Sequence, residues 1–314
     1  MTPVLIVAFI CFTGMPGAAS PVLSISPEQQ LALADTFFHR AEYGAAVTEY
    51  TRFSHFFPEH PRSVYAVFQT ALSYFLQQDF KKAWPLFESL AERGVDDRYG
   101  IEARFMISRC ALAMDRPGPA AAVLENLIAS VDDADVRDRA NYHLGWISLL
   151  SDTTIDAAVI NRADEYFVRI GDENRAIYNM AALTDRLHDV ETDGQGRLLP
   201  RKDPRLAGGL AVIPGAGYVY CGRYQDALMS FLFNTVMACA VYEAFDADLE
   251  ALGGLMGMVG FGFYAGNIYG SISAAHKFNR AHEAMFLNRL KEIRVEAGPL
   301  TGQGGMAMRL SLPF

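Results

Sequence analysis

The feature that most constrains this chain is a set of small residues that recurs with a period of 37. The first set is Ala34, Ala71, Ser108 and Gly145, and the second, twelve residues later in each unit, is Ala46, Ala83, Ala120 and Ala157. Large apolar residues follow in three units and lapse in the fourth: Tyr50, Phe87 and Leu124, then Phe53, Leu90 and Leu127. Small residues let paired helices approach closely, and pairs that cannot bury their apolar faces alone must stack. The period predicts an all-α solenoid of helix pairs over residues 26–190.

These columns resemble the tetratricopeptide-repeat (TPR) family. The first unit carries the family's spacing most fully, at Leu33, Ala34, Phe37, Ala46, Tyr50, Phe53 and Pro58. The resemblance implies a concave face that binds partner proteins or peptides. Phe37, Phe38, Tyr74 and Phe75 are candidates to line that face, although aromatic residues at helical spacing more often fill a core.

Residues 43–90 resemble more specifically the bacterial envelope branch of this family, which includes the lipoprotein of the outer-membrane barrel-assembly machine and the periplasmic coordinator of cell division. The shared feature is an aromatic-rich second helix that ends in Phe57-Pro58-Glu59-His60-Pro61. This resemblance implies other envelope proteins as partners.

The fourth unit drifts from the pattern. We expect its first helix over residues 137–150 and its second over 156–170, with Ala163, Phe167 and Ile170 facing inward. Residues 174–190 then read as one capping helix, since a terminal repeat needs a polar outer face.

The N-terminus has the layout of a secretory signal peptide over residues 1–20. Val4–Phe12 is an unbroken apolar run, and Gly17-Ala18-Ala19-Ser20 supplies small residues for cleavage. The run is too short to span a bilayer, which takes ~20 residues. A cleaved leader places the repeats in the periplasm; an uncleaved anchor is the alternative.

A polar linker at residues 191–205 precedes a glycine-rich membrane domain at 206–275, and an amphipathic helix with a tail follows at 276–314. Three uncharged stretches, 206–222, 227–242 and 251–275, predict a transmembrane helical hairpin with two or three membrane segments. The first stretch reads as a re-entrant or tilted element, yet we favour three crossings. With two, both basic flanks would lie outside, against the positive-inside tendency. Phe278, Met285, Leu290 and Ile293 mark the apolar face of the amphipathic helix.

Small residues four apart, at Gly262, Gly266, Gly270 and Ala274, share one face of the last membrane helix. Such faces let helices pack closely in lipid. The expected neighbour is the helix at 227–245 or a second copy of the chain, which would make a homo-oligomer. Asn234 and Asn267 lie in apolar surroundings, so a hydrogen bond across the helices is expected.

The stretch from Ile213 to Asn234 resembles a membrane motif found in TPR-containing bacterial membrane proteins, Pro-Gly-x-Gly-x-x-Tyr-x-Gly-x-x-x-Asp-Ala. Its positions are Pro214, Gly215, Gly217, Tyr220, Gly222, Asp226 and Ala227. The motif implies an architecture and no activity.

Several functions are disfavoured. The net charge of −9, with no basic stripe, argues against nucleic acid. The four cysteines form no CxxC pair, and no catalytic, metal or cofactor motif occurs. We therefore expect no enzyme and no cofactor, but a membrane-tethered scaffold that binds envelope proteins. The alternative is an accessory subunit of a membrane complex for assembly, secretion or transport, in which the hairpin is the working part.

Overall fold

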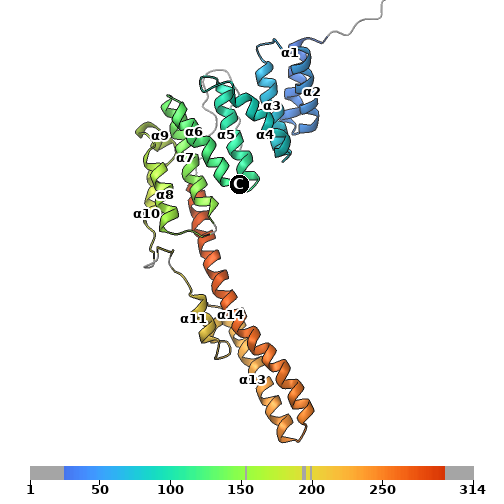
Figure 1. Ribbon diagram of the computed structural model, residues 1–314, viewed down its shortest axis with the longest axis vertical. Coiled ribbons are helices and arrows are strands. Elements are labelled where there is room, and N and C mark those ends of the chain that lie inside the picture. The colour runs from blue at the N-terminus through green and yellow to red at the C-terminus, as the bar shows by residue number, and fades with distance from the viewer. Residues whose placement is uncertain (1–24, 153, 193–195, 199, 294–314) are drawn as a thin grey trace, which may run out of the picture. The chain divides into compact units, whose positions relative to one another are not determined.

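The computed structural model describes residues 25–152, 154–192, 196–198 and 200–293. The signal-peptide prediction and the predicted tail after residue 293 lie outside these residues. Among them there is no strand, only two isolated bridges, and the chain divides into two compact units after Leu86. The helices of Figure 1 are α1 (Pro27–His39), α2 (Tyr43–Phe56), α3 (Ser63–Leu76), α4 (Phe80–Ala91), α5 (Arg98–Ala113), α6 (Pro117–Ser130), α7 (Ala134–Ser151), α8 (Ala157–Val168), α9 (Asp172–Ile177), α10 (Met180–His188), α11 (Pro204–Leu210), α12 (Ala216–Tyr220), α13 (Tyr224–Asp246) and α14 (Glu250–Ile293).

The first unit begins with the helix pair that the sequence predicts. Ser26 caps α1 through a reciprocal capping box with Gln29, and Pro27 occupies the first turn, where its missing N–H costs nothing. Ala34 on α1 and Ala46 on α2 are both fully buried, as are Tyr50 and Phe53 on α2. The small residues therefore lie at the interface and the large residues fill the core behind them.

The second unit continues the same packing through α5–α8. The Ser108 hydroxyl on α5 donates a 2.9 Å hydrogen bond to the Ala120 carbonyl on α6, so two predicted positions meet. A side chain at Gly145 on α7 would overlap the Phe167 ring of α8. The predicted fold class is thus confirmed: helix pairs form a solenoid, and two long apolar helices follow it. Ala120 in this unit is fully buried and Ser108 nearly so, and Ala71 and Ala83 in the first unit are fully buried as well.

Two details of the fourth unit differ from the prediction. Ala157 is only half-buried, because it begins α8 and donates its backbone N–H to the Gly196 carbonyl instead of facing Gly145. The prediction of one capping helix at 174–190 is wrong. The segment is divided into α9 and α10 at Asn179, which has the left-handed φ of 51° that asparagine tolerates better than most residues. The inward residues Ala163, Phe167 and Ile170 are buried as predicted.

Two helices among the described residues, α13 and α14, are long and apolar enough to cross a membrane by length and composition. The segment at 206–222 instead folds into α11 and α12. At ~1.5 Å per residue these are far shorter than the ~30 Å of a bilayer core. The third crossing that the sequence favoured therefore has no helix of spanning length at 206–222.

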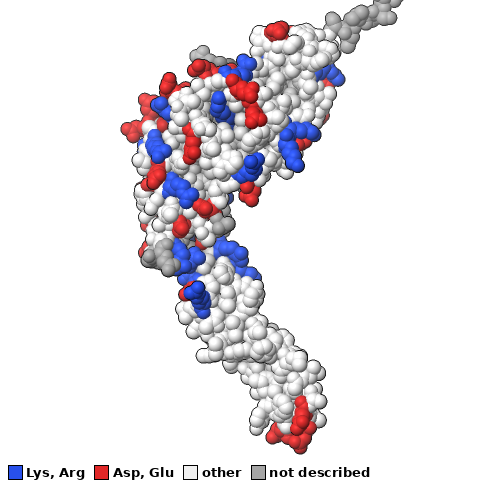
Figure 2. Space-filling view, in the orientation of Figure 1, with Lys and Arg blue, Asp and Glu red and all other residues white. Residues whose placement is uncertain are grey.

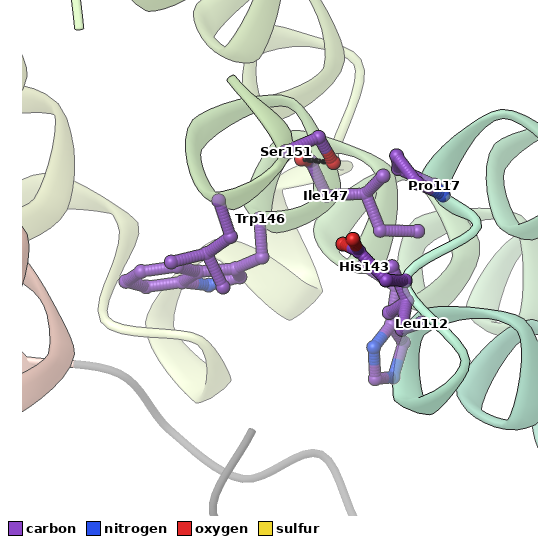
Figure 3. Close-up of a pocket in the computed structure, with 8 residues that line it drawn as sticks. Leu112, Pro117, His143, Trp146, Ile147 and Ser151 are labelled. Carbon is purple, nitrogen blue, oxygen red and sulfur yellow. Dashed lines mark hydrogen bonds between the residues drawn. The ribbon is translucent and has the colours of Figure 1, made fainter. Parts of the chain in front are cut away.

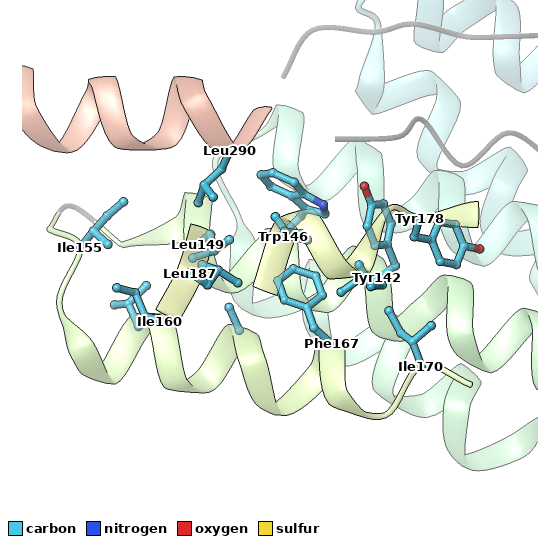
Figure 4. Packing of buried hydrophobic residues seen from close by; sticks show 14 of the residues in the cluster. Tyr142, Trp146, Leu149, Ile155, Ile160, Phe167, Ile170, Tyr178, Leu187 and Leu290 are labelled. Atoms are coloured by element: carbon cyan, nitrogen blue, oxygen red, sulfur yellow. The ribbon is translucent and has the colours of Figure 1, made fainter. Parts of the chain in front are cut away.

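The last apolar stretch and the amphipathic stretch form one continuous 44-residue helix, α14. Its C-terminal turns pack on the core of the last repeats, where Leu290 is 1% exposed and contacts a cluster that includes Leu187 and Trp146 (Figure 4). Leu198 from the linker is buried in the same cluster. Met285, predicted on the apolar face, is instead exposed. One rigid element therefore joins the apolar hairpin to the repeats.

Candidate functional site

A pocket of about 130 Å³ opens between α5, α6 and α7 (Figure 3). Its walls are mostly apolar, and it carries three polar side chains, from Asp115, His143 and Ser151. Asp115 follows the end of α5 in a left-handed turn, and Ser151 ends α7, so both lie where helices end. The full lining is Leu112, Asp115, Pro117, His143, Trp146, Ile147, Leu150 and Ser151.

None of the four aromatic residues proposed to line a binding face borders this pocket. Phe38 and Phe75 are buried core residues, in line with the alternative interpretation, whereas Phe37 and Tyr74 are half-buried. The sequence did contain a signal for the pocket: Trp146 directly follows Gly145, a predicted packing residue. The pocket was not predicted because the turn between α5 and α6 also lines it, and no residue of that turn belongs to the repeating columns.

A second candidate site lies at the base of the hairpin and centres on Asn267 of α14. Its side-chain oxygen accepts hydrogen bonds from the Gly215 backbone N–H at 3.1 Å and from the Ser230 hydroxyl of α13 at 2.7 Å. Its amide nitrogen donates to the Ala211 carbonyl at 2.6 Å. Asn267 thereby satisfies backbone groups of the loop between α11 and α12, which would be costly to leave unpaired in apolar surroundings. Asn234 instead donates to Ser230 within its own helix.

The glycines of the membrane motif allow this close packing. Gly215 has φ of 88°, a conformation that residues with a Cβ rarely adopt, and an added Cβ would overlap the Ala227 carbonyl. An added Cβ at Gly217 would overlap the Ala207 carbonyl of α11 and press on Ser271 of α14. Gly222 also has a positive φ, of 75°. The motif therefore joins α11, α12, α13 and α14 at one place.

The polar motif residues lie at the edge of this junction. The Tyr220 hydroxyl accepts a 3.0 Å hydrogen bond from the Asp203 backbone N–H, and Asp226 pairs with Arg223. Pro214 is half-buried between Ile213 and Gly215, and Ala227 is buried. The contacts observed at Gly215, Gly217, Tyr220 and Asp226 are structural: close packing of helices, a hydrogen bond and an ion pair.

Hydrogen bonds and an ion pair join the linker to α14 next to this junction. Both the N–H and the carbonyl of Lys202 bond the Asn279 side chain, at 2.8 and 2.9 Å. Arg201 pairs with the buried Glu283 at 3.3 Å. The Lys202 ammonium lies 4.7 Å from the Tyr220 ring centre, within the range of a cation–π contact.

The predicted small-residue face divides into two parts. Gly270 and Ala274 pack against the α11–α12 segment: a side chain at Gly270 would overlap the Tyr218 hydroxyl, and Ala274 is 1% exposed. At Gly262 and Gly266 an added Cβ would meet nothing, so α13 is not their neighbour as expected. The face of α14 that does approach α13 carries Gly253 and Gly260, against Phe245 and Met237.

Within the described ranges, no group of three or more His, Cys, Asp or Glu side chains could hold a metal ion. Burial raises the pKa of the Cys110 thiol to about 12, which keeps it protonated and unreactive at neutral pH. The fold and the two sites define a class: a helical-repeat protein with a small pocket among its repeats and an apolar helical hairpin.

Comparisons with known proteins found similarity to solved structures alone. No family model and no curated protein matches the chain. It is similar to the TPR-like repeats of a putative kinesin light chain from Podosopora anserina, with 14% identity over 64% of this chain and 89% of that chain and a TM-score of 0.37. The apo form of RapI has 11% identity, over 86% of this chain and 65% of that chain, with a TM-score of 0.41. A TPR-repeat protein from Bacteroides fragilis has 12% identity, over 86% and 100%, with a TM-score of 0.32. Similarity this low indicates nothing about partners, and the assignment of the fold rests on the helix pairs themselves.

Proposed function

We propose that this protein is a membrane-tethered scaffold of the bacterial envelope, in which the repeats bind a partner protein and the hairpin anchors them. The observation that carries the binding role is the pocket between α5, α6 and α7. Its volume of about 130 Å³ is close to that of an apolar cavity able to take up benzene, ~150 Å³. It therefore suits one apolar side chain of a partner segment, while Asp115 and Ser151 provide polar contacts for the flanking backbone.

The exposed side chains of the hairpin support the anchoring role. Phe231, Phe233 and Val236 on α13 and Met258 and Phe261 on α14 are each about half exposed or more. Soluble monomers rarely expose contiguous apolar patches larger than a few hundred Å². Lipid is the solvent in which such a surface is stable.

In this proposal the leader delivers the repeats to the periplasm, and the membrane is the inner one. The charge pattern opposes that orientation, because two crossings leave the basic flanks on the side of the repeats. The alternative is an accessory subunit whose hairpin is the working part. The small-residue face at Gly262 and Gly266 favours it, because an added Cβ there meets no other part of this chain and a helix of a neighbouring subunit could pack closely.

Membrane anchoring is tested by extracting membranes with alkaline carbonate. An integral protein stays in the pellet. Recovery of the full-length protein in the supernatant would refute the tether.

Partner binding is tested by selecting peptides from a displayed library on the full-length protein in detergent. Ser151→Trp places a large ring at the exposed edge of the pocket without removing a core side chain. We expect it to weaken the selected peptides at least ~10-fold, the equivalent of one lost apolar contact of ~1.4 kcal/mol. Ser130→Trp, at an exposed position of α6 outside the pocket, is the matched control. Equal binding by both variants would place the peptide site elsewhere.

A further inference from the structure

We propose that the base of the hairpin is a docking surface for anionic phospholipid headgroups, formed by Arg201, Lys202, Arg205, Arg223, Lys277 and Arg280. This base ring deepens the proposed function and rests on it, because it requires that α13 and α14 lie in a membrane.

Charge is distributed unequally along the hairpin. Residues 201–226 and 276–283, at the base, hold these six basic side chains against three acidic ones, Asp203, Asp226 and Glu283. Residues 243–250, at the tip, hold four acidic side chains and no basic one, and the surface between is uncharged (Figure 2). Only the base has the charge that complements an anionic headgroup.

Several of the base cations are available to a ligand. Arg205, Lys277 and Arg280 are exposed, and none of the three forms an ion pair with another residue that the structure describes. Arg201 and Arg223 instead have acidic partners, Glu283 and Asp226. The surface therefore keeps positive charge after its internal pairs are counted.

The position of Lys202 is fixed before any ligand arrives. Asn279 holds its backbone by two hydrogen bonds, and its ammonium lies 4.7 and 5.5 Å from the ring centres of Tyr220 and Phe278. Less conformational entropy is lost when a ligand binds to a group that is already held.

The spacing along α13 places the base ring at headgroup depth. Arg223 and Glu243 are separated by ~30 Å at ~1.5 Å per residue, which equals the thickness of a bilayer's hydrocarbon core. Exposed tyrosines mark the same two levels, with Tyr224 70% and Tyr242 73% exposed. Tyrosine is enriched where the membrane meets water.

Apolar side chains directly beside the base ring favour lipid over a soluble anion. Val212, Ile213 and Val219, in and around α12, are 50–66% exposed. A free phosphate would gain nothing from these groups, whereas a phospholipid places its phosphate on the cations and its acyl chains on the apolar surface.

The test measures which lipids the full-length protein retains. The protein is equilibrated in detergent micelles with equal amounts of phosphatidylglycerol and phosphatidylcholine, and the bound lipids are counted by native mass spectrometry. We expect phosphatidylglycerol to be enriched, since each basic residue near an anionic lipid surface increases the binding affinity roughly five-fold. In the variant Lys202→Gln/Arg205→Gln/Arg223→Gln, the ratio of bound phosphatidylglycerol to bound phosphatidylcholine should fall at least ~10-fold.

The control variant Arg40→Gln/Lys81→Gln/Arg98→Gln removes the same charge from exposed positions in the repeats. It should keep the enrichment; a loss equal to that of the base variant would mean that only net charge matters and would overturn the proposal. If the triple base variant does not fold, Arg205→Gln alone carries the test, with a loss of roughly five-fold.

Two further results separate this proposal from the others. Nanodiscs are assembled with phosphatidylcholine alone or mixed with phosphatidylglycerol. Failure to enter either disc refutes the membrane tether itself, whereas entry into both with no lipid preference refutes only the base ring. Displacement of the lipid by inorganic phosphate, beyond that by sodium chloride of equal ionic strength, would assign the surface to a soluble anion instead.

Discussion

The side chain of Asn267 on α14 closes the loop that contains Gly215, accepting its backbone N–H at 3.1 Å while donating to the Ala211 carbonyl at 2.6 Å. A single residue 52 positions away thus replaces the helical hydrogen bonds that the loop lacks. The relationship explains how an irregular segment is tolerated between apolar helices, since its polar groups are paired inside the protein.

Asn267→Leu should destabilise the hairpin by about 2–4 kcal/mol, because it removes three hydrogen bonds and leaves buried backbone groups unpaired. Unfolding of the purified protein in mixed SDS micelles measures this. Asn234→Leu is the matched control, since the side chain it removes bonds only to Ser230 of its own helix. Its expected cost is below ~1 kcal/mol. Equal effects would show that Asn267 does not close the loop.

The two halves of the predicted glycine face should respond oppositely to bulk. Gly270→Leu forces a side chain onto Tyr218 and should lower the melting temperature by several degrees, at ~1–3 kcal/mol for an overpacked site. In Gly266→Leu the added side chain begins where no other atom of the same chain lies nearby, so the melting temperature should stay unchanged. A large loss of stability in Gly266→Leu would indicate a neighbour at that face, such as a second copy of the protein.

Leu290 should couple the hairpin to the repeats. Leu290→Ala empties a fully buried site and should cost about 2–4 kcal/mol. Met285→Ala, on the same helix but 51% exposed, should cost less than ~0.5 kcal/mol. Limited proteolysis adds a specific readout: cleavage near the end of α14 should be faster in the first variant only.

The sequence predicted the helices of the repeats well. The alanine columns predicted α1–α8, because a small residue is needed wherever two helices cross closely, whichever residue it contacts. The full burial of Ala34 and Ala46 confirms this prediction. Side-chain direction was harder to predict. Four-residue spacing placed Gly262 and Gly266 on one face, yet α13 lies against Gly260, since helix contact depends on the turn at residues 247–249. The pocket could not be predicted from the sequence either, because its walls come from three helices whose relative positions must be known first.

Alkaline pH should weaken the first unit. The Asp35 carboxylate accepts hydrogen bonds from the Tyr50 and Tyr65 hydroxyls at 2.6 and 2.8 Å. Burial first, and then the hydrogen bond of Tyr65 to Asp35, raise the pKa of Tyr65 to about 12. Burial raises the pKa of Tyr50 as well. The stability that depends on a neutral Tyr65 is fully present below pH 10 and is lost as pH rises toward 12. Thermal melts across this window should show a smaller loss for Tyr65→Phe than for the wild type.

The hairpin predicts that the repeats and the tip lie on opposite sides of the membrane. A cysteine-free background carrying Asp248→Cys, in the tip, or Arg98→Cys, in the repeats, is labelled in intact cells with a reagent that does not cross membranes. We expect only one of the two to react, because α13 crosses once between them. Labelling at Arg98→Cys would support export by the leader, and labelling at Asp248→Cys would show that the basic base faces inward. If both sites react from outside, α13 does not cross the membrane and the hairpin cannot be the anchor.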